Sequence, residues 1–150
     1  MSILGARHRL VVLDTAPLIY FLRGDARRAA HVREILQAAT SGELELVISA
    51  ITEAELLVAP LRAGDPSAVS TVHALLNGSV NFRLHELTRP IARRAAGLRA
   101  ECSLRLADAL VAATGIELGC TALVSNDTAF RRLGDRIEYV HLDDFGGPTR

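Results

Sequence analysis

Two stretches of the sequence end a run of apolar residues in a carboxylate. In RLVVLDTAPLIY, the apolar residues 10–13 are followed at once by Asp14, and in TALVSND a similar run is followed by Ser125, Asn126 and Asp127. Such short apolar runs are typical of buried β-strands, so both acids are expected where a strand ends. Each acid could also be only a helix cap, accepting hydrogen bonds from the free N–H groups of a helix start.

Two further segments carry acids into predicted helices. In LVISAITEAELLVAP, Glu53 and Glu55 fall in the first turns of a helix; Glu55 alone could be an exposed helical acid, and Glu53 is the better candidate for exposure. In LRLADALVAATGIELG, Asp108 has leucine, valine and alanine neighbours, among which a carboxylate without a partner is costly to bury. Asp143 and Asp144, after the last predicted strand, are expected in a solvated turn rather than as ligands.

Acids at two strand ends and in two adjoining helices together indicate a cation. Carboxylates gathered in one cleft repel one another and need a cation to stay ionised together. The five histidines show no pairing at metal-ligand spacing, and a set of oxygen ligands selects Mg²⁺ or Mn²⁺. Because such ions coordinate phosphate oxygens and activate water, these residues predict a metal-dependent phosphodiesterase.

The predicted elements explain how the acids could meet. Short apolar strands alternate with amphipathic helices, which is typical of an α/β fold with a mostly parallel sheet between helical layers. In such sheets ligands bind beyond the carboxyl ends of the strands. A helix can begin near Pro17, Ser49 is a predicted N-cap and Gly119 a predicted helix end. The predicted strands are Leu10–Leu13, Leu46–Ile48, Asn81–His85, Thr121–Ser125 and Glu138–His141, and the predicted helices are Ala26–Ala39, Ala50–Leu61, Pro66–Leu76, Pro90–Arg99 and Arg105–Leu118.

Composition narrows the function classes. The 150 residues suit a single domain over residues 1–150. No apolar run approaches the roughly 20 residues that cross a bilayer, and two cysteines are too few for a disulfide framework. We therefore expect a soluble cytoplasmic protein. All 17 basic residues are arginine, which excludes P-loop and Schiff-base lysines and disfavours receiver domains and haloacid-dehalogenase-type phosphatases, which use a lysine at the phosphate.

In their order along the chain, VVLDTAPLIYFL, ISAITEAELLVAP, LADALVAATGIELG and LVSNDTAF closely resemble the PIN-domain nucleases. Within that superfamily they are most similar to the VapC toxins of bacterial toxin–antitoxin pairs, and the resemblance spans nearly the whole chain. It implies a three-layer α/β/α fold and an Mg²⁺-dependent ribonuclease, with Mn²⁺ as a substitute. The alternative is a catalytically silent PIN-like module that binds RNA or protein, but such a module would be expected to have lost acids.

The resemblance also assigns residues to roles. Asp14 and Asp108 would be the principal metal ligands, with the other two acids completing the site directly or through water. The glutamate of the family falls on Glu55 rather than on Glu53. The catalytic and metal-binding residues assigned in this way are Asp14, Glu55, Asp108 and Asp127, and the supporting polar residues are Thr15, Ser125 and Asn126.

Partners follow from the same resemblance. VapC-like proteins act on RNA, are held inactive by a cognate VapB-like antitoxin whose tail fills a groove beside the acids, and usually form homodimers or toxin–antitoxin hetero-oligomers. Because RNA must approach the acids against its own charge, we expect arginines around the cleft, and Arg105 lies close to Asp108 in the sequence. Three arginine pairs could also contribute or could lie on solvated helix faces: Arg27–Arg28, Arg93–Arg94 and Arg131–Arg132.

Overall fold

A parallel five-stranded sheet forms the centre of the structure, a computed structural model that describes residues 2–145. Met1 and residues 146–150, which the predicted domain 1–150 includes, lie outside the described residues. The strand order is β3-β2-β1-β4-β5, so β1 lies in the middle between β2 and β4. The strands are β1 (Leu10–Leu13), β2 (Glu45–Ser49), β3 (Phe82–His85), β4 (Ala122–Ser125) and β5 (Glu138–His141).

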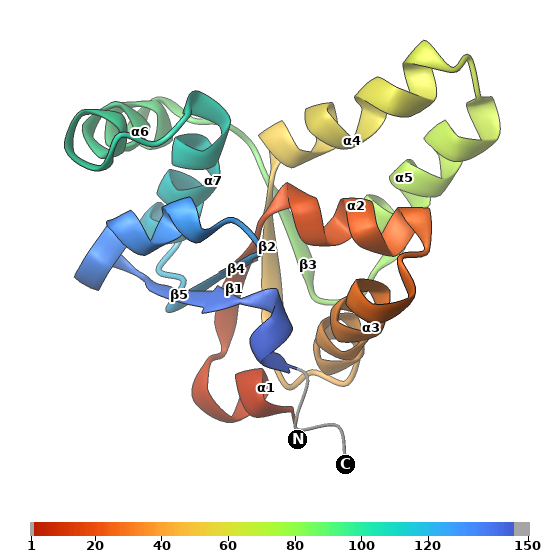
Figure 1. The fold of residues 1–150 in the computed structure, drawn as a ribbon, viewed down its shortest axis with the longest axis horizontal. Helices are drawn as coiled ribbons and strands as arrows, with labels where there is room; N and C mark the ends of the chain where they lie inside the picture. The colour runs from red at the N-terminus through yellow and green to blue at the C-terminus, as the bar shows by residue number, and fades with distance from the viewer. Residues whose placement is uncertain (1, 146–150) are drawn as a thin grey trace.

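Helices cover both faces of this sheet (Figure 1). Alternate residues of β1 point to opposite faces: Val11 and Leu13 pack with helices α2, α3, α4 and α5, whereas Val12 packs with α6, α7 and the 3₁₀ segment η1. The predicted three-layer α/β/α fold is therefore confirmed. The helical segments are α1 (Ile3–Arg7), α2 (Thr15–Arg23), α3 (Ala26–Thr40), α4 (Ala50–Arg62), α5 (Pro66–Gly78), α6 (Arg89–Cys102), α7 (Leu106–Glu117), η1 (Thr128–Arg136) and η2 (Leu142–Phe145).

The observed element boundaries lie within about three residues of the predicted ones, with local reasons for the differences. Ser49 caps α4 as predicted, because its hydroxyl accepts a hydrogen bond of 3.3 Å from the N–H of Ile51. Arg105, predicted inside the last long helix, instead has an extended backbone at the N-cap of α7. The short segments α1 and η2 were not predicted from the sequence pattern. Asp144 is exposed as expected, but Asp143 lies 4.0 Å from His31 and 3.9 Å from His141, so its side chain is not simply solvated.

Helix α7 approaches the sheet unusually closely at Gly115. A Cβ atom on this residue would lie 2.4 Å from Cγ1 of Val12, which is fully buried in β1. Only glycine allows this separation, and the contact fixes how α7 lies across the central strand. Among residues 2–145, none of the helices has both the length and the apolar character that a membrane span requires.

Candidate active site at the carboxyl edge of the sheet

The carboxyl ends of β1 and β4 bring Asp14 and Asp127 to one edge of the sheet. The N–H of Asp14 donates a hydrogen bond of 3.0 Å to the carbonyl of Val124, which continues the pairing of the two strands. The buried hydroxyl of Ser125 donates to Oδ2 of Asp14 over 2.7 Å and accepts from the N–H of Asp127 over 3.0 Å. Ser125 therefore connects the two strand-end acids directly.

The two strand-end acids differ in whether they cap a helix. Asp14 precedes α2 and is 6% exposed, but among the described residues its side chain makes no capping hydrogen bond to that helix. Oδ1 of Asp127 does cap the following segment η1, since it accepts a hydrogen bond of 2.8 Å from the N–H of Ala129. Capping therefore accounts for one oxygen of Asp127 and does not explain Asp14.

Helix α4 presents its two glutamates to different neighbours. The hydroxyl of Thr15 donates to Oε1 of Glu55 over 2.8 Å and lies 2.9 Å from the hydroxyl of Thr52. Glu53 instead has its carboxylate 3.8 Å from Nδ1 of His73 on α5. Glu55 thus lies beside the end of β1, and Glu53 does not. Thr52 was not predicted to lie at the site, although its spacing of three residues from Glu55 puts both on one helix face.

Asp108 reaches the same edge from the first turn of α7. Its side chain is 13% exposed, and Nε of Arg105 lies 3.3 Å from its Oδ2. Nη2 of the same arginine lies 3.8 Å from Oδ2 of Asp127. Burial raises the pKa of Asp108, the Arg105 guanidinium opposes that rise, and the Asp127 charge adds to it. One guanidinium therefore bridges Asp108 of α7 and Asp127, which follows β4.

The electrostatics of Asp14 link all four acids. Burial raises the pKa of Asp14 to about 6, and the hydrogen bond from Ser125 opposes this rise. The negative charges of Asp108 and Glu55 raise the pKa of Asp14 further. Since Asp108 is in turn coupled to Asp127, the structure brings together the four acids that the sequence analysis selected.

The chemistry of this cluster suits a hard divalent cation. The atoms that these acids offer to a metal are carboxylate oxygens, the ligands that Mg²⁺ and Mn²⁺ prefer. The side-chain amide of Asn126, next to Asp127, is buried and has no hydrogen-bond partner within the described part of the chain, so it can serve a ligand or water. Within residues 2–145, no group of three or more Asp, Glu, His or Cys side chains is spaced to hold a metal as arranged. Arg105 and Thr15 engage oxygens of Asp108, Asp127 and Glu55 instead.

A groove of about 870 Å³ runs between α2, α4 and α5 and includes Glu55 in its wall. Its lining is mainly apolar, with cationic residues from α2 and α4 beside it. The groove therefore extends from the acid cluster along an apolar surface. Its lining includes Ile19, Leu22, Leu56, Val58, Val72, Arg23 and Arg62.

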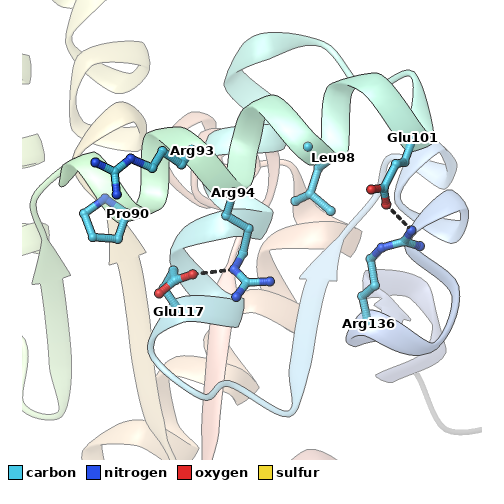
Figure 2. Close-up of a pocket in the computed structure, with 8 residues that line it drawn as sticks. Pro90, Arg93, Arg94, Leu98, Glu101, Glu117 and Arg136 are labelled. Carbon is cyan, nitrogen blue, oxygen red and sulfur yellow. Dashed lines mark hydrogen bonds and ion pairs between the residues drawn. The ribbon is translucent and has the colours of Figure 1, made fainter.

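The arginine pairs lie in several places. Arg93 and Arg94 line a separate surface cavity of about 470 Å³ on α6 and α7, in which Arg94 points to Glu117 (Figure 2). Arg28 lies over the ring of Tyr20, 4.5 Å from its centroid. Arg132 donates to the carbonyl of Ser103. Of the arginines singled out in the sequence, Arg105 is the one that pairs with the candidate acids.

The fold is that of a known family. A model of the PIN domain matches residues 11–136, so the chain belongs to the PIN domain family, as its sequence motifs suggested. A search of curated proteins finds no significant match.

Several solved structures share the fold. VapBC2 from Rickettsia felis, bound to a DNA fragment from its promoter, has a TM-score of 0.72 at 17% identity, covering 88% of this chain and 98% of that one. A toxin–antitoxin complex from Klebsiella pneumoniae has a TM-score of 0.66 at 23% identity, covering 88% and 97%. The sarcin–ricin loop cleaving toxin VapC20 of Mycobacterium tuberculosis has a TM-score of 0.66 at 17% identity, covering 83% and 95%.

Proposed function

We propose that this protein is a VapC-like toxin, a divalent-metal-dependent endoribonuclease that a cognate VapB-like antitoxin neutralises. The observation that carries the proposal is the clustering of Asp14, Glu55, Asp108 and Asp127 at one edge of a PIN-domain sheet. The kinship with VapC structures supports RNA as the substrate, since one of them is a sarcin–ricin loop cleaving toxin. Mg²⁺ is the proposed cofactor, with Mn²⁺ as a substitute.

The four acids are proposed to bind the divalent cation and to activate the attacking water. Asp14 and Asp108 act as the principal ligands, and Glu55 and Asp127 complete the set. When bound, the divalent ion neutralises these carboxylates, polarises the scissile phosphate and acidifies water. A carboxylate, Asp127 or Glu55, orients or deprotonates the attacking water. The products are two RNA fragments, and no covalent enzyme intermediate is required.

Three polar residues support the acids. The Ser125 hydroxyl fixes one oxygen of Asp14, and the Thr15 hydroxyl fixes one oxygen of Glu55. Each bond restricts a carboxylate before substrate arrives, which reduces the reorganisation that the reaction needs. The buried amide of Asn126 offers a donor and an acceptor to a bound water or to the substrate.

The groove between α2, α4 and α5 is the proposed antitoxin site. Because Glu55 forms part of its wall, a peptide that fills the groove also covers the acid cluster. Its apolar lining suits the apolar face of a helical or extended tail. Toxin–antitoxin complexes among the similar structures support such a partner.

We further propose that the protein is cytoplasmic and forms a homodimer. Exposed apolar residues such as Leu61 would contribute to the dimer interface.

An RNA-cleavage assay tests the proposed function. The purified chain, with Mg²⁺ or Mn²⁺, should cut a structured ribosomal, transfer or messenger RNA, and the cleaved ends can be located by sequencing. EDTA and the Asp14→Asn variant should each abolish the cuts. Full activity in EDTA would contradict the metal mechanism, whereas RNA binding without cleavage in any metal would favour the silent PIN-like module.

A further inference from the structure

Arg105 lies where it can hold two of the candidate acids at once. Its backbone at the N-cap of α7 is extended, and its side chain is 82% exposed. From there Nε lies 3.3 Å from Oδ2 of Asp108 and Nη2 lies 3.8 Å from Oδ2 of Asp127. These contacts join the start of α7, which carries Asp108, to the N-cap of η1, which is Asp127.

One carboxylate oxygen of Asp108 and one of Asp127 are therefore shared with an arginine. Oδ1 of Asp127 already accepts the capping hydrogen bond from Ala129, whereas Oδ2 takes no part in capping. That oxygen and Oδ2 of Asp108 are the two that face the guanidinium. A divalent ion held by these two oxygens would compete with Arg105 for them.

Resting on the proposed metal-dependent function, we propose that Arg105 is a positioning residue that acts as an internal counter-ion. In the metal-free protein it holds Asp108 and Asp127 together and screens their repulsion. On metal binding, the Arg105 guanidinium would give up these oxygens and turn into solvent, where most of its side chain already lies. Exposed ion pairs contribute little free energy, so displacing the guanidinium from the two carboxylates costs little. Arg105 thereby lowers the metal affinity of the site while it stabilises the metal-free fold.

The two effects of removing Arg105 have opposite signs. Arg105→Gln should bind Mn²⁺ about fivefold more tightly, because the competing cation is lost. In EDTA the same variant should melt at a lower temperature than the wild type, because Asp108 and Asp127 then repel each other unscreened. A merely structural role for Arg105 would instead weaken metal binding and stability together.

Calorimetric titration of the full chain with Mn²⁺, without RNA, measures the affinity, and thermal melting in EDTA measures the stability. Arg105→Lys keeps the charge without the forked geometry and should fall between the wild type and Arg105→Gln. Arg93→Gln, on the separate cavity of Figure 2, is the matched control and should change neither quantity. Equal or weaker Mn²⁺ binding by Arg105→Gln overturns this inference alone. Failure of every protein, wild type included, to bind Mn²⁺ overturns the proposed metal-dependent function as well.

Discussion

Ser125 donates a hydrogen bond of 2.7 Å to Asp14 across 111 residues of chain. The pairing of β4 with β1 makes this contact possible, because it sets the ends of the two strands side by side. The same hydroxyl accepts the N–H of Asp127. A single buried hydroxyl thus contacts both strand-end acids, while burial raises the pKa of Asp14.

The raised pKa of Asp14, about 6, predicts a pH-dependent stability. Between about pH 4 and pH 6 the folded protein binds more protons at this residue than the unfolded chain does. The free energy of unfolding therefore falls as pH rises through this window. Asp14 should contribute a loss of at most about 3 kcal/mol by pH 7 in the metal-free protein. Urea unfolding in EDTA from pH 4 to pH 7 should show a flatter dependence for Asp14→Asn; parallel curves for the two proteins would refute this prediction.

Glu55 and Glu53 form a matched pair for mutation. Glu55 accepts a hydrogen bond from Thr15 beside the acid cluster, whereas Glu53 faces His73 on α5. Glu55→Gln should lower the rate of RNA cleavage by about 100-fold or more, the range for a general base or an oriented ligand. Glu53→Gln should stay within about twofold of the wild type. If Glu53→Gln lost cleavage and Glu55→Gln retained it, Glu53 rather than Glu55 would be the glutamate of the site.

Asp108→Asn should inactivate the protein without unfolding it. Burial and the Asp127 charge raise the pKa of Asp108 despite the opposing Arg105 guanidinium, so removing this charge relieves desolvation and repulsion in the metal-free state. The melting temperature in EDTA should therefore hold or increase, and cleavage should fall by orders of magnitude because an amide does not replace an anionic ligand. Mg²⁺ should raise the melting temperature of the wild type more than that of the variant. A variant that cleaves RNA normally would remove Asp108 from the site.

Gly115→Ala should destabilise the fold by about 1–3 kcal/mol, because the added methyl group overlaps the buried side chain of Val12. Val12→Ala in the same chain should recover part of this loss, and the double-mutant cycle measures the coupling. Gly97→Ala in α6 is the control, since a Cβ there meets no described atom within 4 Å. It should be neutral or slightly stabilising by denaturant unfolding. Equal changes in stability for the two substitutions would show that α7 can shift away from Val12 without loss of packing.

The strand-end acids were predictable because two local rules suffice for them. A short apolar run gives a buried strand, and a parallel sheet gathers the carboxyl ends of its strands at one edge. The order β2-β1-β4 then brings Asp14 and Asp127 together. The assignment of Glu55 rather than Glu53 was not derivable in this way, since helical periodicity only separates the two residues. It came from family resemblance and stays a prediction; in the structure Glu55 contacts Thr15 beside the end of β1, whereas Glu53 faces His73.

Arg105 shows where the sequence stopped being informative. Its proximity to Asp108 follows from their spacing of three residues, but its contact with Asp127 depends on how α7 packs against the sheet. The backbone at Arg105 is extended although the pattern predicted helix there. The short segments α1 and η2 were missed for a related reason, because four or five residues carry too little periodicity to identify a helix.

The central place of β1 in the sheet has a consequence for biosynthesis. Ser125 is added to the growing chain 111 residues after Asp14, which is about 6–20 s later at ordinary rates of translation. Until then Asp14 has neither its hydroxyl donor nor the strand that pairs with that side of β1. On the proposed function, the nuclease site therefore cannot be complete until most of the chain has been translated.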